Sequence, residues 1–199
     1  DSVPLDPFDT ALSSTNSGAV NEETTSVYLQ SALYFEVANM PVDINLGVRY
    51  EKTDVTSDVV QRVEDQIVWS NPTEWQLRYE SGGAQDVSFV GEHDVTLPTI
   101  DIKVEVTDEI IARMSWGKTI TRAPLGNLIG IRNLSGSPKP GSRIGSQGNT
   151  NLLPFESTNF DLSAEYYYDD ASYISLGYFQ KDVKNFITTT SETITVEGL

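Results

Sequence analysis

The sequence predicts an all-β fold, an antiparallel up-and-down meander of about six long strands. Apolar and polar side chains alternate along six segments, as in an extended strand, where successive side chains point to opposite faces. The segments run to about 10 to 14 residues, whereas strands of globular proteins cluster near 5 or 6. The connections between them are alternately very short and very long.

The first two expected strands, about 26–37 and 42–55, carry the clearest alternation. Leu29 and its apolar neighbours share one face of the first strand, and Ile44 and its apolar neighbours share one face of the second. A break of four residues that contains Pro41 separates the two segments, and proline favours a tight turn between antiparallel strands. These residues therefore predict a first hairpin.

Two further hairpins follow from the same pattern. Their expected strands are about 96–106, 110–121, 157–168 and 172–188. Within them, apolar Ile102 and Val104 alternate with acidic or basic residues, and Leu162 alternates with Asp161 and Ser163.

The connections distinguish two ends of the expected sheet. The short breaks are at 38–41, 107–109 and 169–171, and the long loops are about 56–95 and 122–156. Short turns at one end and long loops at the other are typical of outer-membrane barrels, in which a tilted strand of about 9 to 11 residues crosses the hydrocarbon layer. The meander is therefore expected to be part of a larger transmembrane β-barrel. A soluble or surface-exposed β-sheet module that binds a ligand or carbohydrate remains the alternative, because one buried and one solvated face give the same alternation.

Residues 1–25 are expected to be the remnant of an extracellular loop, residues 26–190 the partial barrel, and residues 191–199 the start of the next loop. The first residue is not a methionine, which suggests a segment of a longer protein.

Composition excludes several kinds of function. The formal net charge of −16 argues against nucleic acid, because phosphate neutralisation needs clustered Lys and Arg. The chain has no cysteine and a single histidine, His93, so we expect neither a thiolate metal site nor a His-pair zinc site, and no cofactor. His93 itself is expected to be a solvated loop residue. No motif identifies a catalytic pair, so an enzyme, for instance one acting on glycans, is the least favoured reading.

Five segments resemble, in the same order, strand motifs of TonB-dependent outer-membrane receptors. They are residues 45–54, 97–102, 114–124, 148–162 and 177–187. The spelling departs from the commonest forms at Ala123 and at Leu153-Pro154-Phe155. Within the family, the sequence is most similar to the subgroup of Caulobacter- and Xanthomonas-like bacteria that is often linked to carbohydrate uptake.

The resemblance implies energised import of a scarce solute, a carbohydrate or a ferric chelate, through the outer membrane of a Gram-negative bacterium. Family members combine a barrel of about 22 strands with an N-terminal plug, through which the inner-membrane protein TonB acts. A chain of six strands without a plug is therefore expected to be an internal part of the barrel. Alone, such an open sheet is expected to self-associate, because unpaired edges recruit other strands.

Aromatic and basic residues in the first long loop are the candidate ligand contacts: Trp69, Trp75, Tyr79, Arg62 and Arg78. Aromatic faces stack on sugars or flat chelates, and arginine offers paired hydrogen bonds to carboxylates. The same aromatic residues could instead form a cluster that stiffens the loop. The Gly/Ser/Pro-rich run 133–151 is expected to be mobile.

The two faces of the barrel wall receive separate expectations. The polar set expected to face the lumen is Arg49, Glu51, Lys103, Glu105, Arg113 and Glu165. The apolar set expected to face outer-membrane lipid is Leu29, Leu33, Ile44, Leu46, Ile102, Val104 and Leu162.

Overall fold

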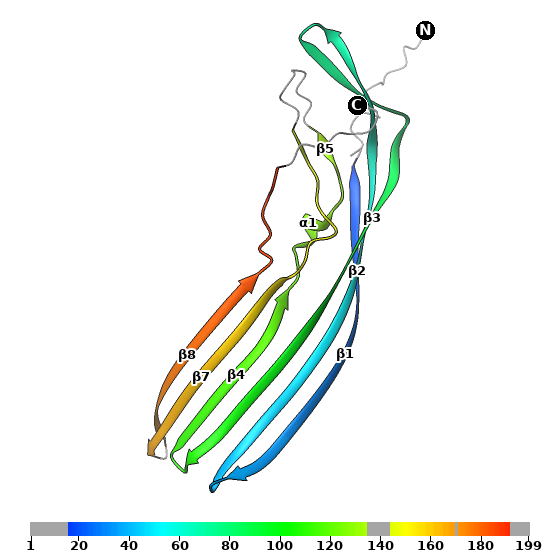
Figure 1. Ribbon diagram of the computed structural model, residues 1–199. Helices are drawn as coiled ribbons and strands as arrows, with labels where there is room; N and C mark the ends of the chain where they lie inside the picture. Colours follow the sequence, from blue (N-terminus) through cyan, green and yellow to red (C-terminus); the bar gives the residue numbers. More distant parts are fainter. Residues whose placement is uncertain (1–15, 135–143, 170, 192–199) are drawn as a thin grey trace, which may run out of the picture.

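The computed structural model describes residues 16–134, 144–169 and 171–191. In this part of the chain six strands form one antiparallel sheet in the order β1-β2-β3-β4-β7-β8 (Figure 1). They are β1 (Ser17–Val37), β2 (Met40–Asn71), β3 (Glu74–Thr107), β4 (Ile110–Thr121), β7 (Phe155–Asp169) and β8 (Ser172–Lys184). Each of these strands pairs with the next along the chain, which confirms the predicted antiparallel meander.

Three tight turns join the strands at one end of the sheet. The first, between Val37 and Met40, holds Ala38 at φ 52° and Asn39 at φ 64°. Two successive left-handed residues match the right-handed twist of a hairpin, and asparagine tolerates this conformation well. Pro41 lies inside β2, opposite Glu36, and not in the turn as the sequence suggested.

Residues 56–95, expected as a long loop, are strand for almost their whole length and continue β2 and β3 into a single hairpin. Its tip is a turn in which the Asn71 side chain accepts a hydrogen bond from Thr73 N at 3.0 Å. The alternation is hard to read here because polar Ser57 and Gln61 are buried on the same face as Val55 and Val59. Because the buried face carries both polar and apolar residues, the sequence of this segment shows no regular alternation of apolar and polar side chains.

Two other boundaries also differ from those the sequence suggested. Residues 17–25, assigned to a loop remnant, extend β1 and pair with residues 52–60 of β2, whereas residues 1–15 lie outside the described part. β8 ends at Lys184, just before Asn185 takes φ 60°, so the last strand is shorter than expected.

The long hairpin contains an elbow (Figure 1). Arg62 faces Ala84 and Glu64 faces Tyr79, so β3 inserts residues 80–83 where β2 has only one residue. Gly83 lies within this bulge at φ +86°, which glycine adopts without the penalty that a side chain would carry. The bulge bends the hairpin beyond it away from the line of the sheet.

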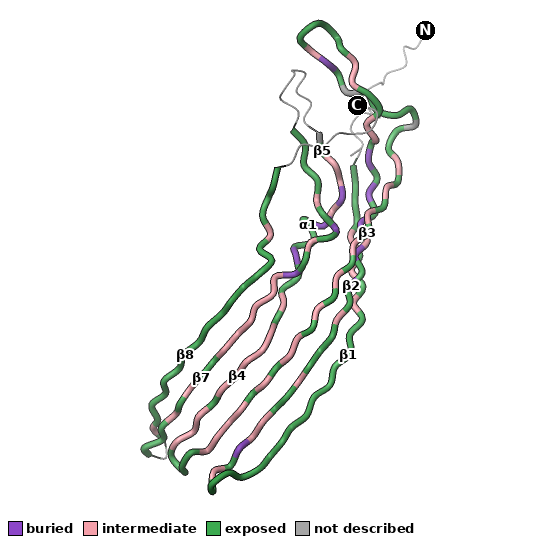
Figure 2. The backbone as a smooth tube through the Cα atoms, viewed as in Figure 1, coloured by how far each residue is buried: buried purple, intermediate pink, exposed green. Residues whose placement is uncertain are grey.

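The described parts of the connection between β4 and β7 lie against the sheet. They contain α1 (Leu125–Leu128), β5 (Asn133–Leu134) and β6 (Gly145–Ser146). We call residues 122–132 and 147–152 the ledge. Figure 2 shows buried residues concentrated where the ledge lies near β2 and β3, whereas the lower sheet is half-buried or exposed apart from Val42 near the first turn.

Hydrogen bonds and apolar packing hold the ledge in place. Gly130 N donates to Ser57 Oγ at 3.0 Å, Arg132 N donates to Gln61 Oε1 at 2.8 Å, and Thr150 Oγ1 donates to Val90 O at 3.1 Å. The buried side chains of Ser57 and Gln61 are thus satisfied by backbone N–H groups of the ledge. The apolar cluster between the ledge and the sheet consists of Val55, Ala123 and Leu128. Val20, Leu152 and Ile187 pack against it.

Glycines permit the close approach of the ledge to the sheet at two positions, Gly130 and Gly91, and the close approach of the two parts of the ledge to each other at Gly148. A Cβ at Gly130 would lie 2.2 Å from Phe89 Cδ2, and one at Gly91 would lie 2.2 Å from Thr150 O. At Gly148 a Cβ would lie 2.2 Å from Ile129 O. Residues 135–143 of the run that was expected to be mobile lie outside the described part. The segments on either side of them are held by hydrogen bonds, from Arg132 N to Gln61 Oε1 and from Gln147 Nε2 to Gly130 O.

The strand register gives the sheet two chemically distinct faces. On one, the polar face, Asp43, Lys103, Arg113 and Ser163 form a row across β2, β3, β4 and β7. On the other, the apolar face, lie all seven residues expected to contact lipid, from Leu29 on β1 to Leu162 on β7. Within the six-stranded sheet β1 and β8 each have one unpaired edge, and self-association of the isolated chain through these edges stays a prediction.

Replacing Gly130 with alanine should loosen the ledge, because the new methyl group would collide with the Phe89 ring and overpacking typically costs about 1–3 kcal/mol. Limited proteolysis of the full-length protein should then cut the β4–β7 connection faster. Gly126→Ala is the matched control, since its Cβ would meet nothing within 4 Å. Equal cleavage rates in the two variants would show that the close approach at Gly130 does not hold the ledge.

Candidate functional site

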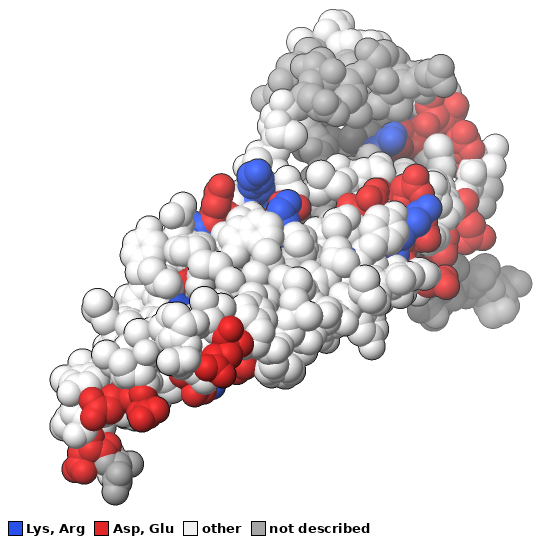
Figure 3. Space-filling view, turned by 60° about the horizontal axis from the view of Figure 1, so that its bottom comes forward, with Lys and Arg blue, Asp and Glu red and all other residues white. Residues whose placement is uncertain are grey.

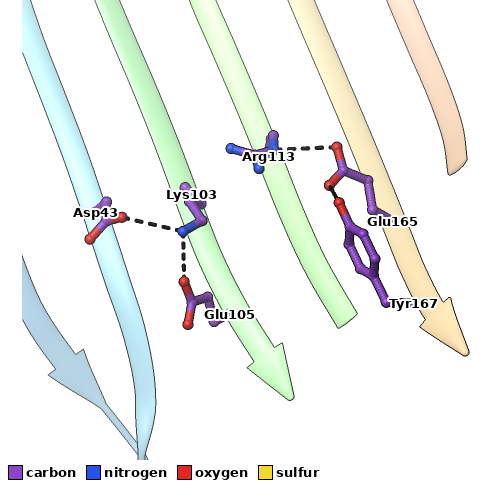
Figure 4. A network of polar contacts seen from close by, with 6 residues as sticks. All are labelled: Asp43, Lys103, Glu105, Arg113, Glu165 and Tyr167. Atoms are coloured by element: carbon purple, nitrogen blue, oxygen red, sulfur yellow. Dashed lines mark hydrogen bonds and ion pairs between the residues drawn. The ribbon is translucent and has the colours of Figure 1, made fainter. Parts of the chain in front are cut away.

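The polar face carries a row of ion pairs near the short turns (Figure 4). Lys103 Nζ lies 2.6 Å from Glu105 Oε1 and 3.7 Å from Asp43 Oδ2. On the next two strands Arg113 Nε lies 3.4 Å from Glu165 Oε1, whose other carboxylate oxygen accepts a 2.9 Å hydrogen bond from the Tyr167 hydroxyl. These side chains are partly exposed in the sheet, so each pair contributes little to stability by itself. The carboxylates do, however, neutralise the positive charges of Lys103 and Arg113.

A second group of charges lies higher on the polar face, below the ledge. Arg49 Nε is 3.1 Å from Glu51 Oε1, and Arg122 Nη2 is 4.0 Å from Glu51 Oε2. Arg122 also donates to Thr24 Oγ1 at 3.0 Å. The six residues that the sequence assigned to the lumen therefore share one face, and the structure adds Arg122 as a further cation that shares Glu51 with Arg49.

The ledge and the elbow meet in another ion pair. Arg132 Nη1 lies 3.8 Å from Glu64 Oε2, and the Glu64 side chain is only 7% exposed. Sequence analysis missed this pair because Arg132 and Glu64 are far apart in the chain. The only local signal is Arg132 standing between a short apolar run and a Gly/Ser/Pro-rich segment.

A shallow hollow of about 360 Å³ lies on the polar face between the two groups of charges. Its polar lining includes Asp43, Asn45, Asp101, Lys103, Arg113, Ser115, Asp161 and Ser163. Ser115 Oγ donates to Asp101 Oδ1 at 2.6 Å. The hollow is thus lined by amide, hydroxyl and carboxylate groups, together with two cations that already have carboxylate partners.

The distal hairpin, residues 64–79, carries the aromatic candidates. Trp69 and Trp75 are paired across the hairpin, but Trp75 is 4% exposed and Trp69 is 52% exposed. Tyr79 is 42% exposed, and the Arg62 guanidinium carbon lies 5.8 Å from its ring centre. Arg78 is exposed opposite Gln66. The structure therefore presents two rings to solvent and uses the third for packing.

His93 lies in β3 on the polar face, paired with Thr53, and not in a solvated loop. Its Nε2 atom is buried without a hydrogen-bond partner among the described residues. Among the described residues, no three His, Asp or Glu side chains lie close enough together to hold a metal ion.

The outer edge of the apolar region is marked by a charged pair. Lys52 Nζ lies 2.9 Å from Glu92 Oε2 and 3.8 Å from Asp54 Oδ1. The hydrogen bond and the charge of Lys52 hold the pKa of Glu92 below its ordinary value, and the same hydrogen bond raises the pKa of Lys52. Both groups are exposed, so the pair keeps Lys52 charged without stabilising the fold appreciably.

On the face shown in Figure 3, acidic side chains gather at the turn end, and most of the visible basic side chains lie farther along the molecule, beside other acidic ones. None of the described helices is long and apolar enough to cross a membrane. A two-faced antiparallel meander, with tight turns at one end and folded long connections at the other, defines a segment of a β-barrel wall.

Comparison with known proteins identifies the barrel. The model of the family described as "TonB dependent receptor-like, beta-barrel" matches residues 1–198, and the chain belongs to this family. Its members are outer-membrane receptors and not enzymes, so the alternatives of a soluble binding module and of a glycan-active enzyme are set aside. No curated protein matches the chain.

Two solved structures that match the chain are both of a ferric enterobactin receptor, the first from Pseudomonas aeruginosa. A mutant of that receptor in complex with enterobactin gives a TM-score of 0.42 at 14% identity, covering 83% of this chain and 28% of the receptor. A second structure of the receptor gives 0.42 at 13% identity, covering 84% and 27%. The chain thus spans little more than a quarter of these receptors.

Burial separates the roles of the two hairpin tryptophans. Trp75→Ala should destabilise the distal hairpin strongly, since removing a buried tryptophan typically costs about 3–5 kcal/mol. Trp69→Ala, the matched control on the opposite strand, should change stability far less. Hydrogen exchange of residues 64–79 in the full-length protein would measure the difference. Equal protection in both variants would contradict the burial of Trp75.

Proposed function

We propose that this chain is a wall segment of a TonB-dependent transporter that takes up a scarce solute, a carbohydrate or a ferric chelate, with energy supplied through TonB. The observation that carries the proposal is the family match over almost the entire chain. In this proposal the long connections face outward and capture the solute. A plug elsewhere in the receptor closes the barrel and receives the pull of TonB.

The polar face would then line the lumen and the apolar face would contact lipid. Residues 42–50 of β2 alternate without a charge on the apolar face, and at about 3.3 Å per residue they extend roughly 30 Å. A tilt of about 40° reduces this to roughly 23 Å, close to the apolar band of about 25 Å in known barrels. Aromatic residues border the band at the far end (Tyr50, Trp116, Phe160 and Tyr178) and near the turns (Phe35, Tyr166 and Tyr168).

The distal hairpin would present the first aromatic contacts to an arriving solute. Trp69 offers an exposed ring, and the Arg62–Tyr79 pair offers an aromatic ring beside a guanidinium group. Such groups suit the stacking of a sugar ring or a flat chelate.

Spin labels on the full-length receptor in lipid bilayers test the assignment of faces. Labels at Leu29, Ile102 and Leu162 should be strongly relaxed by oxygen dissolved in the lipid, because these positions lie on the apolar face. Labels at Lys103 and Asp161, on the polar face, should be shielded from it. The opposite pattern would reverse the proposed wall.

Energised uptake tests the function itself. Cells that produce the full-length receptor should accumulate a radiolabelled solute from a panel of oligosaccharides and ferric chelates, and accumulation should stop when a protonophore collapses the proton-motive force. Cells that lack the receptor provide the control. Receptor-dependent entry that persists in the presence of protonophore would indicate a passive pore and would refute the transporter proposal.

A further inference from the structure

The ledge lies on the polar face at the far end of the sheet, where solute would enter if the proposed function holds. Buried hydrogen bonds to Ser57 and Gln61 and the close packing of Gly130 on Phe89 fix its backbone. A surface held in one conformation loses little conformational entropy when a ligand binds. The ledge therefore offers a preorganised surface in the solute path.

The exposed polar side chains of the ledge are mostly uncharged amides. Asn127, Asn149 and Asn151 are exposed, and Gln147 beside them donates to Gly130 O at 3.1 Å. An amide both donates and accepts hydrogen bonds, as does the hydroxyl group of a sugar. The adjacent wall adds hydroxyl groups, including Thr24, whose Oγ1 atom lies 2.9 Å from Thr53 Oγ1.

The two arginines of the ledge are both held by carboxylates of the wall. Arg122 contacts Glu51, whose side chain is 12% exposed, and Arg132 contacts Glu64, which is 7% exposed. Binding an anion through Arg132 would take from Glu64, a carboxylate in poor solvent contact, its cationic partner, which is costly. Glu51 would keep Arg49 at 3.1 Å but lose the second cation that it shares. The arginines are therefore poorly placed to accept an anionic ligand.

The wall below adds no compensating positive charge. Arg49, Lys103 and Arg113 are also paired with carboxylates, whereas Asp101 and Asp161 add negative charge to the hollow beneath the ledge. The chain as a whole has a net charge of −16. The field of this segment therefore repels an anion, whereas its carboxylate oxygens accept hydrogen bonds from neutral hydroxyl groups.

We infer that the ledge and the facing wall of β2 form a solute-binding surface for a neutral, hydroxyl-rich solute of the oligosaccharide class, and not for an anionic ferric chelate. This inference rests on the proposed function and decides between its two solute classes. It assigns Asn127, Asn149 and Asn151 as hydrogen-bonding groups for the solute. Glu51 and Glu64 neutralise the arginines beside them.

Freeing the arginines provides the decisive experiment. The purified full-length receptor and its Glu51→Gln/Glu64→Gln variant would be titrated with a ferric tricatecholate of charge −3. Glutamine keeps the shape of glutamate and releases Arg49, Arg122 and Arg132 from their carboxylate partners. The variant should bind this chelate at least tenfold more tightly than the wild type. The control, Asp108→Asn/Glu109→Gln, removes the same charge in the turn between β3 and β4, at the opposite end of the sheet from the ledge, and should leave chelate affinity unchanged.

Equal chelate affinity in the wild type and the Glu51/Glu64 variant would overturn the inference, and so would an equal gain in the control. Heat-modifiable gel mobility would verify that each variant assembles. A second titration, with neutral glucose and xylose oligosaccharides, should show binding by the wild type that falls at least tenfold in an Asn127→Ala/Asn149→Ala variant. Wild-type binding that is tighter for the chelate than for every oligosaccharide would also overturn it.

The outcomes separate the inference from the function on which it rests. Energised uptake of the ferric tricatecholate with no uptake of oligosaccharides would support the transporter and refute the proposed solute class. Oligosaccharide entry that is insensitive to protonophore would support the solute class and refute energised transport.

Discussion

Backbone hydrogen bonding between neighbouring strands is the constraint on which the rest of this structure depends. In hydrocarbon an unpaired peptide group costs several kcal/mol, so a wall that crosses a membrane must pair every strand along its length. Within the apolar band the meander β1-β2-β3-β4-β7-β8 satisfies this requirement between neighbours and leaves the outer edges of β1 and β8 for the rest of the barrel to complete. The same pairing fixes the register, and the register puts the side chains of every strand on one of two faces.

Outside the apolar band the pairing continues but its role changes. Along β2 and β3 the polar-face residues from Thr53 to Gln61 are buried, because the ledge packs on them, while their neighbours on the other face stay largely exposed. Within the apolar band the sheet is a single layer. Above the band it becomes the base on which the ledge packs as a second layer. Gly91 allows the ledge backbone at Thr150 to approach β3, Gly130 makes room for the Phe89 ring, and Gly148 allows the two parts of the ledge to pack together.

Charge is arranged on this scaffold by pairing across strands. Residues directly opposite or diagonal on antiparallel strands lie within reach of each other. The strand register alone therefore makes Asp43, Lys103 and Arg113 neighbours on the polar face. Arg122 and Arg132 instead reach Glu51 and Glu64 because the ledge folds back over the wall. Most of the basic side chains of the wall are therefore paired with carboxylates. The remaining carboxylates make the electrostatic potential of the polar face negative.

The sequence by itself determined the strands of the band, their two faces and the position of the tight turns, because period-two alternation and turn chemistry are local properties. It also indicated the family through five ordered motifs. It did not reveal that residues 56–95 continue the hairpin, since Ser57 and Gln61 are polar yet buried, nor that Trp75 packs while Trp69 is exposed. The tertiary structure alone decided the ledge and its ion pairs. Arg132 meets Glu64, and Gly130 meets Phe89, only after the chain has folded back on itself, and local sequence carries no record of such distant partners.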